Sequence, residues 1–217
     1  MFFVIVGAGS TGLRLAELAL KDKHEVVLID KDRARCEEVA QKFDVVAIHG
    51  DATHETTLRD AEAARADGLV TTAKEDAVNL MVASIAQKIG VPVVATTVQT
   101  KDIGIMFKDR GVLVVENPSE MASRRLYQAI LRPNLRDLMP VGRGFSVVRV
   151  ELEMLSEYAG RTVQEADFPD TTYIVSIERD GKVVLPEAAT VLEGADVVTL
   201  LTEDHRIDRL VKAFQGK

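Results

Sequence analysis

The sequence predicts an α/β protein with a doubly wound parallel sheet and a second, smaller α+β domain. Strand-like and helical patterns alternate up to about residue 131, which is typical of a parallel sheet covered by helices. A segment with prolines and glycines then interrupts both periodicities. After it, period-two alternation and an Asp-Gly turn signal indicate antiparallel strands. The 217 residues suffice to bury the cores of two domains.

The first part of the chain predicts six strands and six helices. The strands are expected near residues 2–6, 25–30, 45–48, 67–71, 92–96 and 112–115, and the helices near 11–22, 32–43, 53–63, 74–89, 101–109 and 118–131. Thr72-Ala73-Lys74-Glu75 is interpreted as a capping box for the fourth helix. Asn117-Pro118-Ser119-Glu120 combines a capping side chain with a proline at the first helical position, so the last helix should begin sharply.

The second part predicts a small α+β domain. Strands are expected at 145–153, 173–179, 182–185 and 197–201, with a closing amphipathic helix at 203–214. Asp180-Gly181 is the favoured dipeptide for a tight hairpin turn between two of these strands. We therefore expect a first domain at 1–131, a connector at 132–144 and a second domain at 145–217.

A glycine-rich turn follows the first strand and points to a nucleotide. In Gly7-Ala8-Gly9-Ser10-Thr11-Gly12, the first glycine permits a tight turn, the second lets a phosphate approach the backbone, and the third allows close packing of helix and strand. The amides and the positive dipole end of the next helix would face the phosphates. The run lacks the Gly-Lys-Ser/Thr ending of a hydrolytic phosphate loop, so it favours binding over phosphoryl transfer. A turn without a ligand is the alternative.

An acidic residue completes this Rossmann fingerprint. Asp30 ends the second strand, about 20 residues beyond the glycines, where its carboxylate can bind both ribose hydroxyls. It would repel a 2′-phosphate, which favours NAD(H), ATP or ADP over NADP(H). Alternatively, Asp30 only caps the next helix. Because the carboxyl ends of the strands meet at one crevice, the candidate nucleotide-binding residues are Gly7, Ala8, Gly9, Ser10, Thr11, Gly12, Asp30, Asp51, Ala52, Thr72 and Ala73.

Composition excludes several other classes of protein. Apolar residues make up 47% of the chain and no apolar run approaches the roughly 20 residues that span a bilayer, so a cytoplasmic location is expected. Cys36 is the only cysteine, and the four histidines show no spacing typical of metal ligands, so no metal site is expected. The net charge of −7 argues against nucleic acid as a partner. A local basic stretch, best interpreted as a solvated surface, contains Arg124, Arg125, Arg132, Arg136 and Arg143.

The residues resemble the TrkA-type, or RCK (regulator of potassium conductance), family over nearly the whole chain. Beyond the glycine run and Asp30, the resemblance rests on Gly50-Asp51-Ala52-Thr53, Leu58, Ala61, Ala66-Asp67, Glu75-Asp76 and Asn79-Leu80. In the second module it rests on residues 158–162, residues 176–181, Pro186 and residues 193–196. The chain departs from the family at Thr96, where the fifth strand often ends in an arginine, and at the loosened turn Gly194-Ala195-Asp196.

The resemblance implies a cytosolic regulatory subunit at the cytoplasmic face of the membrane. It would form a homo-oligomer, a dimer-based ring such as a tetramer or octamer, beneath a membrane potassium-translocating subunit, and ATP, ADP or NAD(H) would switch that partner. No residue stands out as catalytic, so we expect a non-enzyme. An NAD-dependent oxidoreductase, with the second domain covering a substrate, remains the alternative. A redox-sensing repressor is a further alternative, weakened by the acidic balance of the chain.

Overall fold

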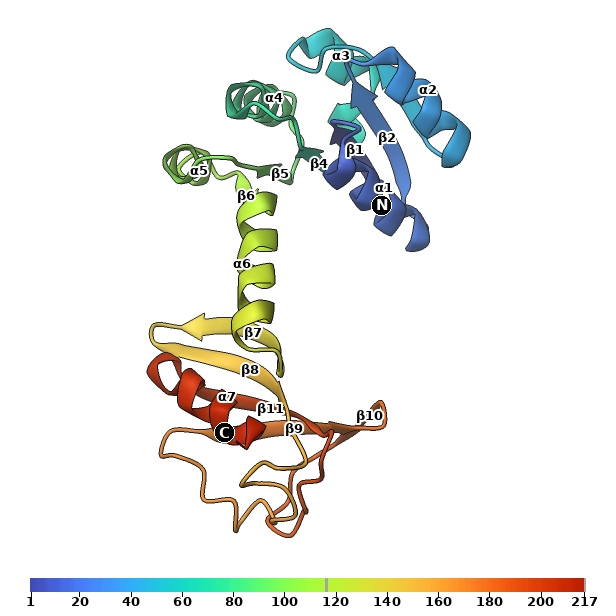
Figure 1. Cartoon of the computed structure of the whole chain (residues 1–217). Helices are drawn as coiled ribbons and strands as arrows, with labels where there is room; N and C mark the ends of the chain where they lie inside the picture. The colour runs from blue at the N-terminus through green and yellow to red at the C-terminus, as the bar shows by residue number, and fades with distance from the viewer. Residues whose placement is uncertain (116, 217) are drawn as a thin grey trace. The chain divides into compact units, whose positions relative to one another are not determined.

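The computed structural model describes residues 1–115 and 117–216. They form two compact units, residues 1–122 and residues 123–217 (Figure 1). Each unit has its own sheet and its own apolar core.

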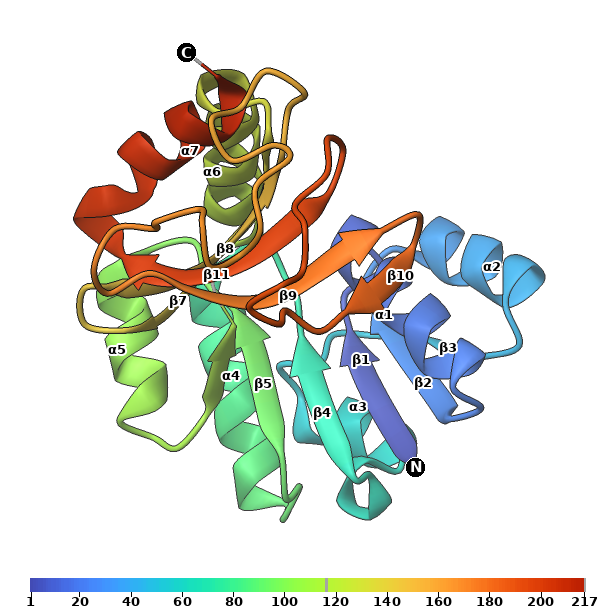
Figure 2. The same ribbon diagram turned by 90° about the horizontal axis from the view of Figure 1, so that it is seen from below.

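The N-terminal unit contains a six-stranded sheet in which every neighbouring pair is parallel. The strand order is β3-β2-β1-β4-β5-β6, so the chain reverses its direction of travel across the sheet between β1 and β4 (Figure 2). Its elements are β1 (Phe2–Val6), α1 (Ser10–Lys21), β2 (Glu25–Asp30), α2 (Arg33–Lys42), β3 (Val46–His49), α3 (Glu55–Asp60), a 3₁₀ turn η1 (Ala63–Arg65), β4 (Gly68–Thr71), α4 (Asp76–Lys88), β5 (Val94–Thr97), α5 (Lys101–Lys108) and β6 (Leu113–Val115). This is the predicted doubly wound sheet.

Alternation along the central strands supplies two apolar cores, one on each face of the sheet. Val4 and Val6 of β1 pack with α3, η1, α4 and α5, whereas Ile5 packs with α1 and α2. Because successive strand residues point to opposite faces, a continuous apolar run is what a strand buried on both sides requires. The carboxyl ends of the neighbouring strands β1 and β4 lie at the point where the strand order reverses. Sheets of this kind bind ligands at that point.

The C-terminal unit contains a five-stranded antiparallel sheet in the order β10-β9-β11-β8-β7. Its elements are β7 (Leu135–Gly142), β8 (Phe145–Glu151), β9 (Tyr173–Arg179), β10 (Lys182–Val184), β11 (Val197–Glu203), a 3₁₀ turn η2 (Asp204–Arg206) and α7 (Ile207–Gln215). The predicted hairpin is confirmed: β9 and β10 pair around Asp180 and Gly181, and both turn residues have positive φ angles. Helix α7 covers one face with Leu210, Val211 and Phe214.

Two predictions about the boundary between the domains differ from the structure. The first compact unit ends at residue 122, within α6 (Pro118–Leu131), earlier than the expected 131. The expected connector 132–144 instead contains β7, which pairs with β8. Proline suggests irregular backbone, but β7 is an edge strand, where proline is tolerated because one side of the strand needs no ladder hydrogen bonds. Register shifts near Leu135 and Pro140 weaken its pattern further.

Helix α6 begins as predicted, whereas α4 does not. The Asn117 side chain accepts hydrogen bonds from the amides of Ser119 (2.9 Å) and Glu120 (3.3 Å), which caps α6. The predicted capping box at Thr72 does not form, because α4 starts at Asp76 with Glu75 at the N-cap position and no side-chain cap. The Thr72 hydroxyl instead donates to carbonyls of the first turn, as described below.

The three glycines after β1 meet different surroundings. Gly7 has a φ of +104°, a conformation that favours glycine. A Cβ on Gly12 would lie 1.9 Å from the Gly7 carbonyl oxygen, so α1 packs directly on the turn backbone. A Cβ on Gly9 would meet no protein atom within 4 Å. Two of the glycines are therefore required by the fold, while Gly9 faces open space.

We predict that alanine destabilises the fold much more at Gly12 than at Gly9. Gly12→Ala should lower the free energy of unfolding by about 2 kcal/mol or more, because the backbone it meets must move. Gly9→Ala should cost less than about 1 kcal/mol, the penalty of a poorer N-cap residue. Urea unfolding followed by far-ultraviolet circular dichroism measures both. Equal stability of the two variants would contradict the packing described for α1.

Candidate functional site

The glycine turn places the start of α1 at the carboxyl edge of the sheet. Gly9 occupies the N-cap position with an extended backbone (φ −78°, ψ −178°), and no side chain caps the helix. The first backbone amides of α1 therefore have no side-chain acceptor, and they lie at the end of the helix where its dipole is positive. Together with the open space beside Gly9, this arrangement can accept a phosphate or another anion.

Thr72 connects this turn to β4, the strand on the other side of the crevice. Its amide donates to the Val6 carbonyl (2.8 Å), and its hydroxyl lies 3.1 Å from the Val6 oxygen and 3.3 Å from the Gly7 oxygen. A Cβ on Gly7 would approach the same hydroxyl to 2.8 Å. The structure thus brings Thr72 and the glycine turn together, as the sequence predicted.

Asp30 is 9% exposed and ties the glycine turn to the end of β2. Its Oδ2 accepts a hydrogen bond from the Ala8 amide (2.6 Å), and its Oδ1 accepts one from the Asp32 amide (2.8 Å). The alternative that Asp30 caps α2 is wrong, because the N-cap residue of that helix is Asp32. Each Asp30 oxygen retains a second lone pair, so the carboxylate can accept ligand hydroxyls while it holds the turn.

Asp51 follows β3 at the same edge of the sheet. The Gly50 amide donates to the Asp30 carbonyl (2.9 Å), which joins the ends of β2 and β3. The Asp51 carboxylate is exposed and accepts hydrogen bonds from the hydroxyl and the amide of Thr53, which lower its pKa. Ala52 is different: its side chain is 5% exposed and lies in the apolar core, so only its backbone faces the edge.

Asn79 supports the site from α4, a role that the sequence patterns did not assign to it. It is fully buried, and its Oδ1 accepts hydrogen bonds from the Thr71 hydroxyl (2.7 Å) and the Ala73 amide (2.9 Å). Its Nδ2 donates to the Ala73 carbonyl (2.9 Å). Asn79 therefore fixes the turn Thr72-Ala73. The signal in the sequence is an amide among the apolar positions of a helix, which must find partners when buried.

Asp76 and Thr96 organise the ends of β4 and β5 in the same way. The Asp76 carboxylate, 8% exposed, accepts hydrogen bonds from the amides of Gln99 (2.9 Å) and Thr100 (3.2 Å) and from the Thr100 hydroxyl (2.8 Å). The fully buried Thr96 hydroxyl donates to the Thr97 carbonyl (2.9 Å). Thr96, where the sequence departs from the family that it resembles, therefore uses its hydroxyl within the sheet.

The chemistry of this edge suits binding of a ligand. The buried thiol of Cys36, in α2, contacts the carbonyls of Asp30 and Ile48. Burial raises the pKa of this thiol, which disfavours the reactive thiolate. Within residues 1–115 and 117–216, no group of three or more metal-ligating side chains is arranged to hold an ion. In the same ranges, no helix is both long and apolar enough to cross a bilayer.

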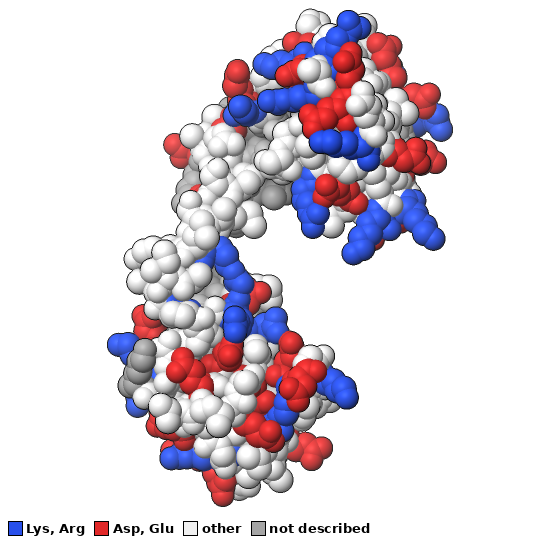
Figure 3. All heavy atoms as spheres, turned by 45° about the vertical axis from the view of Figure 1, so that its right-hand side comes forward, with Lys and Arg blue, Asp and Glu red and all other residues white. Residues whose placement is uncertain are grey.

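The basic stretch is largely neutralised by carboxylates. Arg125 pairs with Asp137 (2.8 Å), Arg132 pairs with Asp208 (2.5 Å), and Arg136 pairs with Glu151. Figure 3 shows positive and negative side chains interspersed over the visible face of both units. These pairs favour a solvated, mixed surface over the single-sign face that a nucleic acid requires.

Comparison with known proteins identifies the family of the chain. The TrkA-N domain model matches residues 3–118 and the TrkA-C domain model matches residues 147–215. A Trk system potassium uptake protein TrkA homolog from Methanothermobacter thermautotrophicus is 30% identical over 217 residues, which is 100% of both chains.

Solved structures share the fold. The GsuK channel aligns with 100% of this chain at a TM-score of 0.69 and 16% identity, and the chain covers 39% of it. The GsuK channel bound to NAD aligns with 98% of this chain at a TM-score of 0.67 and 14% identity, again over 39% of its own length. Both family models and the full-length relative confirm the resemblance seen in the sequence: this chain belongs to the TrkA family, with an N-terminal TrkA-N domain and a C-terminal TrkA-C domain.

Proposed function

We propose that this protein is the nucleotide-sensing regulatory subunit of a potassium uptake system. The observation that carries the proposal is the edge of the sheet where the open space at Gly9, the uncapped start of α1 and the buried Asp30 carboxylate meet. The relative from Methanothermobacter is named a potassium uptake protein, and a structure with the same fold is a channel with NAD bound. The first name refers to potassium uptake and the second to a channel with bound NAD, which together fit a nucleotide-sensing part of a transport system.

The proposed ligand is an adenine nucleotide, either ATP, ADP or NAD(H). Its phosphates would lie at Gly7–Gly12, its ribose hydroxyls would contact Asp30, and Asp51 and Thr72-Ala73 would border the crevice. Asp30 is held by two backbone amides, so its carboxylate is positioned before the ligand arrives. A 2′-phosphate would meet this carboxylate, which disfavours NADP(H).

The proposed partner is a membrane potassium-translocating subunit, which would hold this protein at the cytoplasmic face of the membrane. In this mechanism the nucleotide binds two conformations of the regulatory assembly with different affinity, and that difference biases the partner. The site needs no catalytic group for this task. The contacts of Asn79 and Asp76 support it, because they link the turn beside the ligand to the ends of β4 and β5.

The proposed assembly is a homo-oligomer built from dimers. None of the described α6 side chains is buried, although the helix carries several large apolar residues. The exposed ones are Met121, Leu126, Tyr127, Ile130 and Leu131, with exposed fractions between 51% and 79%. A run of this kind on one helix marks an interface. A second copy of the chain is the proposed occupant, because an isologous contact buries the same helix on both subunits.

We predict that the purified protein binds one or more of ATP, ADP, NAD⁺ and NADH without turning them over. Asp30→Ala should weaken binding about tenfold or more, since the hydrogen bonds to the ribose are charge-assisted. Gly9→Asp should abolish it, because a carboxylate would occupy the phosphate position while remaining a good N-cap residue. Isothermal titration calorimetry measures the affinities.

Matched controls separate lost binding from lost folding. Asp51→Asn removes a charge at the same edge but keeps an acceptor for Thr53, so its effect should be smaller than that of Asp30→Ala. Circular dichroism should show Gly9→Asp folded. Unchanged affinity in Gly9→Asp, or no binding of any of the four nucleotides, would refute the proposed site. In the cell, deletion of the gene should raise the potassium concentration needed for growth, and Gly9→Asp should not restore wild-type growth.

We predict that the protein is larger than its 23.7 kDa chain in solution, and that Ile130→Glu shifts it toward the monomer. Ile130 is 79% exposed in the single chain, so burying a charge there would oppose only the assembly. Leu18→Glu is the control, because it places the same charge at an exposed apolar side chain of α1, outside the proposed interface. Light scattering coupled to size-exclusion chromatography measures the mass. A monomeric wild-type protein would exclude the proposed assembly.

A further inference from the structure

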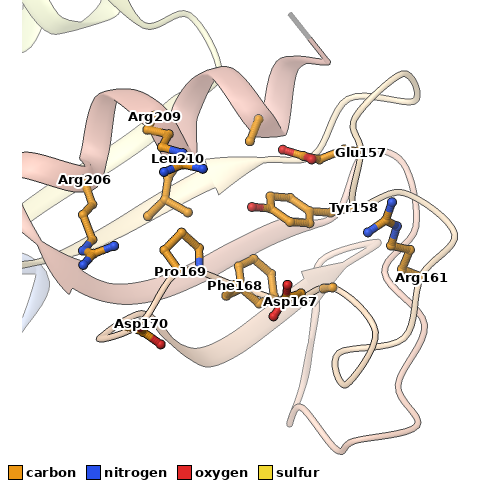
Figure 4. A pocket seen from close by; sticks show the side chains of 12 residues that line it. Glu157, Tyr158, Arg161, Asp167, Phe168, Pro169, Asp170, Arg206, Arg209 and Leu210 are labelled. Carbon is orange, nitrogen blue, oxygen red and sulfur yellow. The ribbon is translucent and has the colours of Figure 1, made fainter.

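A pocket lies wholly within the C-terminal unit, between α7 and the loop that precedes β9 (Figure 4). Its volume of about 450 Å³ lies in the range of small-molecule sites. Phe168, Pro169 and Leu210 form part of its wall, and charged side chains from both segments surround it. Nothing in the proposed nucleotide site involves these residues.

Tyr158 presents an unpartnered hydroxyl to this pocket. The residue is 5% exposed, and its ring packs against Phe168 (centroids 4.7 Å apart) and Phe214 (5.2 Å apart). Both neighbours fix the ring, so its hydroxyl is held in place. Among the described residues none shares a hydrogen bond with this hydroxyl. Burial raises its pKa, so it stays protonated and can donate.

The Tyr158 hydroxyl points toward the side of the pocket where Arg209 and Leu210 lie, and away from Arg161 (Figure 4). Beyond burial, Glu157 raises the pKa of Tyr158, and Arg209 and Arg161 lower it. No described residue forms an ion pair or hydrogen bond with the Arg209 side chain. Arg206, three residues earlier, also lines the pocket and donates to Glu203 (3.1 Å). An unpartnered hydroxyl and an unpaired cation thus face the same space.

Acidic side chains limit what this space can hold. Glu157, Asp167 and Asp170 also line the pocket, so the three arginines are matched by three carboxylates. A polyanion would be repelled by them, so the ligand that fits this space carries one anionic group. The Tyr158 hydroxyl and the Arg209 guanidinium, which have no hydrogen-bond partner among the described residues, are free to donate to such a group.

We propose that the pocket beside α7 binds a small organic anion whose phosphate or carboxylate group accepts hydrogen bonds from Tyr158 and Arg209. Arg206 adds positive charge at the same side, and the apolar wall of Phe168, Pro169 and Leu210 receives the body of the ligand. The site is independent of the nucleotide site, because every residue in it belongs to the C-terminal unit. Through this site the protein can respond to a second small molecule besides the nucleotide.

Calorimetric titration of the full chain with inorganic phosphate, glycerol 3-phosphate and butyrate tests this proposal and distinguishes phosphate from carboxylate recognition. At least one probe should bind saturably below about 10 mM. Tyr158→Phe should weaken that binding about tenfold while keeping the ring packing, since it removes one hydrogen bond to a charged group. Arg209→Gln should weaken it by at least as much, because it removes the charge and shortens the donor.

Two controls locate the binding. Arg161→Gln removes the same charge at the side from which the Tyr158 hydroxyl points away, so it should change affinity less than about twofold. Every probe is also titrated into Gly9→Asp, which blocks the phosphate position at the start of α1, so that the binding that remains is assigned to the C-terminal unit. The proposal is overturned if no probe binds, if Tyr158→Phe and Arg209→Gln bind as the wild type does, or if Arg161→Gln weakens binding as much as Arg209→Gln.

Discussion

The contact between Gly12 and the Gly7 carbonyl is the constraint on which the N-terminal unit depends. It fixes where α1 begins, and so directs the amide end of that helix at the edge where the strand order reverses. Asp30, at the end of β2, and Thr72, directly after β4, then form hydrogen bonds with the backbone at this turn. The ends of β1, β2 and β4 are thereby joined at one short turn of backbone.

Most of this unit could be predicted from the sequence because its signals are local. A strand buried on both faces must be continuously apolar, as in residues 2–6, and the turn after it must contain glycine where φ is positive. The position of Asp30 at the end of its strand follows from the same pattern. The hairpin at Asp180-Gly181 is also predictable, since that turn type selects those residues.

The features that sequence reasoning missed depend on contacts between distant residues. Whether Pro140 ends a strand or sits in one depends on whether its strand lies at an edge, and only the sheet order reveals this. Asn79 receives its role from partners on β4 and β5. The pocket of the C-terminal unit joins Tyr158 to Arg209, which lie far apart along the chain, so the sequence indicated no polar cluster there. Thr72 resembles a cap in the sequence because its actual acceptors, at the end of β1, are distant in sequence.

The missing side-chain cap on α1 also has a thermodynamic consequence. The neighbouring helix α2 is capped by Asp32, whereas the amides at the start of α1 rely on water or on whatever anion occupies the edge. A ligand that binds only the folded state adds RT ln(1 + [L]/Kd) to its stability, about 2.7 kcal/mol at a hundredfold excess over Kd. A cell that depleted such a ligand would therefore lose part of the folded population of this protein, so ligand supply would set its lifetime as well as its state.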